Sequence, residues 1–249
     1  MCEIKIDGAT LKYEVVTNSS TAKQYVSIVG ARDVHEHIMI PEEIEGIPVK
    51  CIGGCAFCGC KGLTGVTIPD CVGWIGESAF TAATNLKYVS IPTSVRGIAE
   101  CAFSCCGGLW SVDIPEGVMW VGFSAFVMCY GLVRVTIPST LESVSRWMFS
   151  DCCSLSSVRI SPGVRSIEGS AFSGCRALRR VMIPESMTSV GKCAFSGCGR
   201  LSSVSAPLHL KNESLESAFV FCSPELKITY RYGENAEPID TDTRGVRFD

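Results

Sequence analysis

Four cysteines lie close together near the start of the chain, in a spacing that could hold a metal ion. They are Cys51, Cys55, Cys58 and Cys60. Four thiolates so near one another could form a tetrahedral zinc site. Two of the four, however, recur at a fixed step further along the chain, and no second Cys-x-x-Cys pair follows, as zinc-binding sequences usually require. We therefore expect no metal at these residues, and no other pattern in the sequence indicates a cofactor.

Histidines are the other candidates for metal binding or catalysis. The chain has three, His35, His37 and His209. The segment His35-Glu36-His37 would present both imidazoles on one side of an extended strand, but it lacks His-Glu-x-x-His spacing, and we interpret it as an exposed polar loop. No Gly-x-Ser-x-Gly motif or phosphate-binding glycine loop occurs. No base is placed beside a cysteine nucleophile. The sequence therefore predicts a protein that is not an enzyme and has no catalytic residue.

Most of the chain is organised as a repeat with a step of 23 residues. Eight of the eleven phenylalanines form one column: Phe57, Phe80, Phe103, Phe126, Phe149, Phe172, Phe195 and, after 24 residues, Phe219. Leucine, valine and isoleucine form three parallel columns, which begin at Leu63, Val66 and Ile68. A fixed period of this length is typical of a solenoid, in which each repeat forms one coil of a stack.

Each column has a physical interpretation. Leu86-x-x-Val89-x-Ile91 is typical of a short strand whose Val and Ile point to the same side. Pro92 then ends the strand because proline has no N–H to donate. A second short extended segment ends in Ile-Gly, where glycine permits a turn, and Ala-Phe places a large ring in the middle of the coil. Stacked coils would bury these columns in one continuous core.

The unit Ile-Pro-x-x-Val-x-x-Ile-Gly-x-x-Ala-Phe-x-x-Cys-x-x-Leu-x-x-Val resembles the BspA-type (Treponema pallidum-like) leucine-rich repeat. The resemblance covers about Ile40 to about Tyr230, with seven copies in phase. It implies a leucine-rich-repeat solenoid, β-rich, with a curved right-handed stack of about seven or eight 23-residue coils, short parallel strands and a cap at each end. It also implies a role in adhesion or protein binding, often on microbial surfaces. Two departures affect local packing: Val144-Ser145-Arg146-Trp147-Met148-Phe149 replaces Ile-Gly-x-x-Ala-Phe, and Ala83 replaces the usual Cys.

Composition excludes several function classes. The net charge of −3 gives no basic surface for nucleic acid. Charged residues make up 19% of the chain and the mean hydropathy is +0.28, yet no apolar run approaches the roughly 20 residues of a transmembrane helix. The first residues do not resemble a signal peptide. We therefore expect a cell-surface or secreted protein if an upstream leader was removed, and a cytoplasmic one otherwise.

We expect three parts. Residues 1–40 would form an N-terminal β cap, with a hairpin turn at Asp7-Gly8. Residues 41–207 would hold the repeats. Residues 208–249 would form a degenerate last repeat, a C-terminal cap and a partly ordered acidic tail from Gly233.

The cysteines are interpreted mainly as packing residues. The chain has 16 in 249 residues, which is below the roughly 8–10% of a disulfide scaffold. Seven of them follow a phenylalanine by three residues: Cys60, Cys106, Cys129, Cys152, Cys175, Cys198 and Cys222. Equivalent residues of neighbouring coils would have parallel Cβ vectors, which suit disulfides poorly. We expect a ladder of buried thiols that act as small apolar side chains.

The outward positions beside the valine column are the candidate ligand-binding face. Its predicted residues are Tyr88, Trp110, Asp113, Arg134, Arg159, Arg179 and Arg180. Tyr, Trp and Arg are enriched in binding hot spots, and arginine can pair with carboxylates or sulfates. We hypothesise that this face binds a protein or an acidic glycan, as an adhesion module would. The alternatives are a merely solvated face and an intracellular protein-interaction scaffold.

A second column contains Trp74 and Trp120, with Gly97 between them. Exposed tryptophans would favour self-association, whereas packed ones would belong to a lateral core. The sequence leaves this choice and the oligomeric state open.

Overall fold

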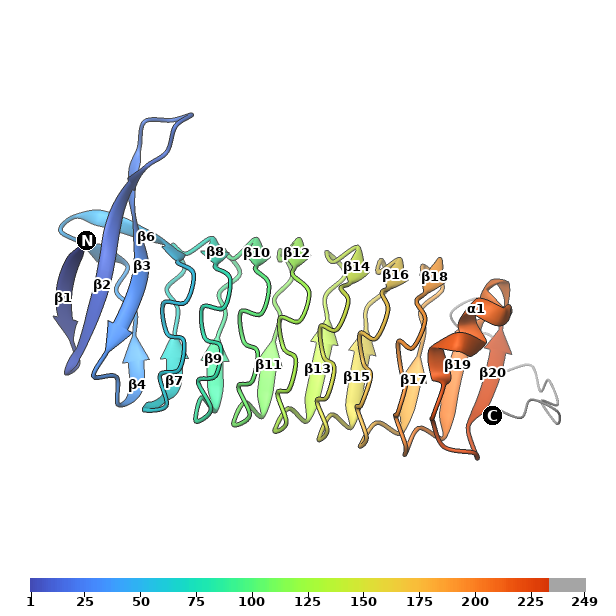
Figure 1. The fold of residues 1–249 in the computed structure, drawn as a ribbon. Helices are drawn as coiled ribbons and strands as arrows, with labels where there is room; N and C mark the ends of the chain where they lie inside the picture. The colour runs from blue at the N-terminus through green and yellow to red at the C-terminus, as the bar shows by residue number, and fades with distance from the viewer. Residues whose placement is uncertain (233–249) are drawn as a thin grey trace.

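The chain forms an elongated stack of coils in a computed structural model that describes residues 1–232, with only the backbone of 213 and 214 (Figure 1). One strand of each coil lies on a common side, and these strands form the long ladder. They are β4 (Glu36–Met39), β7 (Leu63–Thr67), β9 (Tyr88–Ser90), β11 (Ser111–Asp113), β13 (Arg134–Ile137), β15 (Ser157–Ile160), β17 (Arg180–Met182), β19 (Ser203–Pro207) and β20 (Lys227–Arg231). They pair in parallel in three groups of three. The predicted leucine-rich-repeat solenoid is confirmed, with β4 and β20 extending it at the two ends.

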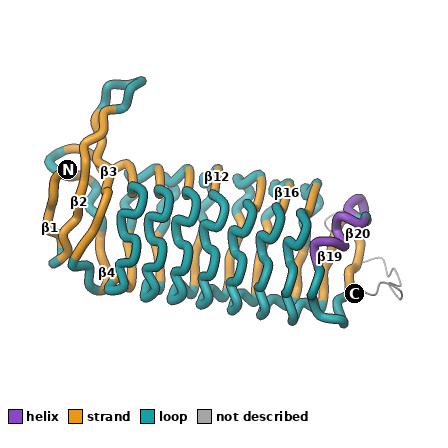
Figure 2. The backbone as a smooth tube through the Cα atoms, in the orientation of Figure 1, coloured by secondary structure: helices purple, strands orange, loops and turns teal. Residues whose placement is uncertain are grey.

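Seven of the coils have a second strand, and these strands form the short ladder along the upper edge in Figure 1. Its members are β6 (Ile47–Ile52), β8 (Trp74–Ile75), β10 (Gly97–Ile98), β12 (Trp120–Val121), β14 (Ser143–Val144), β16 (Ser166–Ile167) and β18 (Ser189–Val190). Neighbours pair in parallel from β6 to β12 and again from β14 to β18. Apart from the helical segments of the last coil, the rest of each coil is loop, as Figure 2 shows.

A glycine follows the short strand in four of the seven coils, at a position where adjacent coils approach closely. A Cβ on Gly122 would lie 2.5 Å from the backbone nitrogen of Glu100. The Gly122 N–H donates to the Ile98 carbonyl at 2.8 Å. In the next coil Ser145 takes this position, and its hydroxyl donates to the Val121 carbonyl instead. This substitution coincides with the break in the short ladder between β12 and β14.

The N-terminal segment closes one end of the stack. Strands β1 (Cys2–Ile6), β2 (Ala9–Thr17) and β3 (Gln24–Arg32) are antiparallel, and β3 pairs in parallel with β6. Strand β5 (Glu43–Ile44) pairs with β6 in the antiparallel sense. The tip of the β2–β3 hairpin projects beyond the coils (Figure 1). The expected loop at residues 35–37 is wrong in part, because Glu36 and His37 belong to β4.

The C-terminal coil departs from the repeat. It contains two 3-10 turns, at Leu208–Leu210 and Ser217–Phe219, and a short helix, α1 (Glu213–Glu216). Strand β20 then pairs with β19. Arg231, which is buried, donates to the Ile183 carbonyl and lies 3.7 Å from the Glu185 carboxylate. The acidic tail expected from Gly233 lies outside the described residues, and the boundaries expected after residues 40 and 207 stay predictions.

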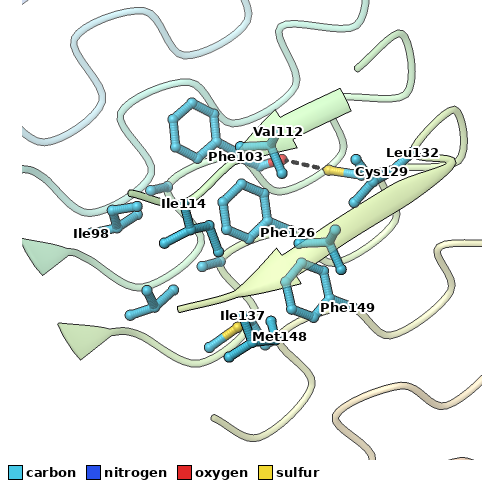
Figure 3. Packing of buried hydrophobic residues seen from close by; sticks show 14 of the residues in the cluster. Ile98, Phe103, Val112, Ile114, Phe126, Cys129, Leu132, Ile137, Met148 and Phe149 are labelled. Carbon is cyan, nitrogen blue, oxygen red and sulfur yellow. Dashed lines mark hydrogen bonds between the residues drawn. The ribbon is translucent and has the colours of Figure 1, made fainter. Parts of the chain in front are cut away.

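A stack of phenylalanine rings runs through the middle of the coils. Each ring of the column from Phe57 to Phe219 is buried, and successive rings stack with centroids between 5.0 Å and 5.4 Å apart. Figure 3 shows Phe103, Phe126 and Phe149 in one row, with Ile98, Ile114 and Ile137 on one side of it. The hydrophobic core is therefore one continuous column, because every ring between Phe57 and Phe219 packs against the rings of both neighbouring coils.

Candidate functional site

The four clustered cysteines do not converge on a common point. Cys51 is half-buried on β6, opposite Trp74, whereas Cys55 and Cys58 are exposed in the following turn. The thiol of Cys60 points to the Ala31 carbonyl at 3.9 Å. Within residues 1–232, no three His, Cys, Asp or Glu side chains are arranged to hold a metal ion. The geometry of these residues thus offers no chelating site.

The seven residues of the predicted face all lie exposed along the long ladder. Tyr88 is on β9, Asp113 on β11, and Trp110 and Arg179 directly precede strands. Trp110 is 56% exposed although it is the bulkiest of the seven. The structure therefore places these side chains on one side of the stack, and we call them the long-ladder face.

The arginines occupy the C-terminal half of this face. Arg134 on β13 lies opposite Ser157, and Arg159 on β15 lies opposite Thr136. The two arginines therefore project from adjacent strands, and the strands are about 4.8 Å apart. Arg180 lies opposite Ser203 on the following pair of strands. Among the described side chains, no carboxylate forms an ion pair with any of the three. Their guanidinium groups are thus available to an external anion.

An aromatic pair marks the other end of the long-ladder face, and sequence reasoning missed half of it. His37 stacks on Tyr88 with ring centroids 5.6 Å apart, although Gly65 lies between them in the ladder. A Cβ on Gly65 would lie 2.4 Å from Tyr88 Cζ, so only glycine leaves room for the ring. His37 Nε2 is also 2.9 Å from Thr67 Oγ1. The step from His37 to Gly65 is 28 residues instead of 23, so the repeat gave no signal for His37.

Next to this aromatic pair is an open hollow of about 450 Å³. Outward residues of the long ladder, including Met39 and Thr67, form one side of it, and the prolines that end the strands form the other. Glu42 and Asp70 contribute carboxylates to its lining. The long-ladder face therefore has acidic groups near one end and arginines toward the other.

The short ladder carries a separate aromatic pair. Trp74 and Trp120 stack with centroids 5.5 Å apart and ring planes 7° from parallel, and both are about two-fifths exposed. Gly97 lies between them, and a Cβ there would be 2.1 Å from Trp74 Cζ3. The tryptophans are therefore packed on each other and exposed at the same time.

Among residues 1–232, no helix has the length and hydrophobicity that a membrane-spanning segment requires. A search of curated proteins found no match. The fold does resemble solved structures. A leucine-rich-repeat protein of T. pallidum is 29% identical with a TM-score of 0.72, over 85% of this chain and 96% of that one. A leucine-rich-repeat protein of Bacteroides ovatus is 28% identical with a TM-score of 0.57, over 92% of this chain and 71% of that one.

The sequence profile of the BspA type leucine-rich repeat region matches six copies, over residues 36–152 and 148–235. These ranges include all nine strands of the long ladder and the whole phenylalanine column. The chain belongs to the BspA-type leucine-rich-repeat family.

Proposed function

We propose that this protein is a non-enzymatic ligand-binding or adhesion module whose long-ladder face holds the ligand. Leucine-rich-repeat proteins commonly serve as protein-binding modules, and the family membership supports that broad role. The observation that carries the proposal is the set of three exposed arginines, Arg134, Arg159 and Arg180, without carboxylate partners among the described side chains. Unpaired guanidinium groups on adjacent strands can form bidentate contacts with carboxylates or sulfates.

The charge distribution favours a protein over an acidic glycan as the ligand. A uniform polyanion would match the arginines but would be repelled near Glu42 and Asp70, which line the hollow at the other end. A protein surface can present both signs of charge, and His37, Tyr88 and Trp110 offer it aromatic contacts. An acidic glycan that covers only the arginine half is the second candidate. An intracellular protein-interaction scaffold would use the same face.

The test is a binding screen against extracellular-matrix proteins, sulfated glycans and source-cell lysate at low and high salt. The variant is the triple replacement Arg134→Ser, Arg159→Ser and Arg180→Ser. Its matched control is Arg165→Ser, Arg176→Ser and Arg200→Ser, which removes the same charge from exposed positions elsewhere. We expect binding that weakens at high salt and is lost in the face variant alone. Equal binding by the wild type and the face variant would overturn the proposal.

A further inference from the structure

The short ladder presents a second exposed surface that the proposed ligand site does not use. Its centre is the coil of β12, where Met119 is 69% exposed and Phe123 is 50% exposed, with Trp120 between them. Trp74 extends the apolar area by two coils through its stacking on Trp120. Monomeric proteins rarely expose a cluster of large apolar side chains without a partner for it. We call this surface, with its flanking charges, the short-ladder face.

The charged residues on the two sides of the β12 coil have opposite signs within each column. In the column of Met119, Arg96 lies one coil before and Glu142 one coil after. In the column of Phe123, Glu100 lies one coil before and Arg146 one coil after. Both columns therefore change sign across the same apolar coil.

A second copy of the chain would meet this pattern with opposite charges. When two identical faces meet about a two-fold axis parallel to the short strands, each column faces itself with the order of coils reversed. Arg96 then faces Glu142 of the second copy, and Glu100 faces Arg146. The apolar coil of β12 faces itself at the centre, so the interface has an apolar core and a charged rim.

The remaining charges of these two columns meet no like charge in this arrangement. In the Phe123 column, Glu77 would face Gly169 and Lys192 would face Gly54. In the Met119 column, Lys50 would face Thr188 and Arg165 would face Gly73. Pairs of like charges across an interface weaken association strongly, so a self-complementary surface must avoid them.

Shape favours the antiparallel arrangement over a parallel one. In a parallel dimer, whose two-fold axis runs along the stack, opposite charges would also meet. Trp74 would then lie directly opposite Trp74 of the second copy, and the two large rings would clash. In the antiparallel arrangement Trp74 faces the small Ser166, and Gly97 faces Ser143. Bulky side chains opposite small ones allow the close packing of a stable interface.

We propose that the protein forms an antiparallel homodimer through the short-ladder face, with Arg96 paired to Glu142 and Glu100 to Arg146 across the interface. All four side chains reach the surface. Arg96 also donates to the Gly117 carbonyl at 3.1 Å, and Arg146 lies over the Trp147 ring at 5.5 Å, so both guanidinium groups are partly oriented. This proposal is independent of the ligand proposed for the long-ladder face, which stays uncovered.

The experiment is sedimentation velocity on the full chain with two charge reversals, Arg96→Glu and Glu142→Arg. We expect the wild type to dimerise at ~10 μM and each variant alone to be monomeric, with the dissociation constant raised at least ~100-fold by two like-charge pairs. An equimolar mixture of the two variants should form a heterodimer. In it the two substituted positions face each other with opposite charges, and the unchanged Glu142 of one copy faces the unchanged Arg96 of the other. Arg176→Glu, at an exposed site away from the face, should dimerise like the wild type.

Each outcome decides the proposal. A wild-type monomer at ~100 μM overturns it, as does a single variant that dimerises as strongly as the wild type. A mixture of the two variants that stays monomeric overturns the antiparallel pairing, since a parallel dimer would keep like charges together in that mixture. Thermal unfolding of each variant checks that the substitutions leave the fold intact.

Discussion

The thiol of Cys129 donates a hydrogen bond to the backbone carbonyl of Phe103 at 3.2 Å (Figure 3). The same contact joins Cys106 to Phe80, at 3.1 Å. It recurs further along the column at Cys152, Cys175, Cys198 and Cys222. These cysteines are therefore more than small apolar side chains, because each donates to a carbonyl of the preceding coil that already accepts one backbone N–H.

Stability should fall steeply at alkaline pH. Burial raises the pKa of Cys106 to about 12 and also raises the pKa of Cys129 and Cys175 above the ordinary value of 9.0. Above pH 9 the unfolded chain releases these protons while the native chain keeps them, so stability is lost as pH rises from about 9 toward about 12. Each such thiol removes up to ~1.4 kcal/mol of unfolding free energy per pH unit. Urea titrations from neutral pH into this alkaline range measure the slope.

The control for the pH experiment is Cys129→Ala, which removes one buried thiol. Its slope in the alkaline range should be shallower than that of the wild type by up to ~1.4 kcal/mol per pH unit. An unchanged slope would show that other groups cause the alkaline unfolding.

Truncating the phenylalanine column should cost most in the middle. Phe126 stacks on both Phe103 and Phe149, at 5.2 Å and 5.4 Å, whereas Phe219 stacks on Phe195 in the last coil. Phe126→Ala should destabilise the fold by about 3–5 kcal/mol through a central cavity. Phe219→Ala should cost less, because the end coil frays more readily. Denaturant titrations that gave equal losses would contradict the capping role of the last coil.

One coil lacks the thiol, and restoring it should stabilise the protein. Ala83 is buried at the cysteine position of its coil, where a thiol could donate to the Phe57 carbonyl as Cys106 does to that of Phe80. We expect Ala83→Cys to gain about 0.5–1.5 kcal/mol in the free energy of unfolding. The matched control is Ala79→Cys, at the buried position before Phe80, which should lose about 1–3 kcal/mol by overpacking. Chemical denaturation of both variants under reducing conditions makes the comparison.

A side chain at Gly97 should separate the stacked tryptophans. Because its Cβ would lie 2.1 Å from Trp74 Cζ3, Gly97→Ala must push the ring of Trp74 away from Trp120. We expect a loss of about 0.5–1.5 kcal/mol from the broken aromatic pair, with a change in the near-ultraviolet circular dichroism. In a Trp74→Ala background the same substitution should have a much smaller effect. If Gly97→Ala lost as much stability in the Trp74→Ala background as in the wild type, the added methyl group would clash with the backbone and not with the Trp74 ring.

The repeat predicted the core well because the 23-residue step alone assigns equivalent residues to one column, and each column faces one environment. The exposed arginines followed from the same logic, since Arg134 and Arg180 occupy an outward position of the strand. His37 could not be predicted, because β4 joins the ladder outside the step. The position of the Trp74 ring over Gly97 could not be predicted either, because the 23-residue step gives the order of side chains and not their rotamers. The ligand-binding role of the long-ladder face stays a prediction.

The two glycines beneath stacked rings constrain the order in which surface substitutions can accumulate. At Gly97, and likewise at Gly65 beneath Tyr88, a larger residue meets an aromatic ring that is already in place. The glycine can therefore change freely only after the neighbouring aromatic has been lost, and an aromatic packed in this way can arise only where the adjacent coil already has a glycine. Neighbouring coils are thus coupled at their surfaces as well as in their core, and a mutation tolerated in one background should fail in another.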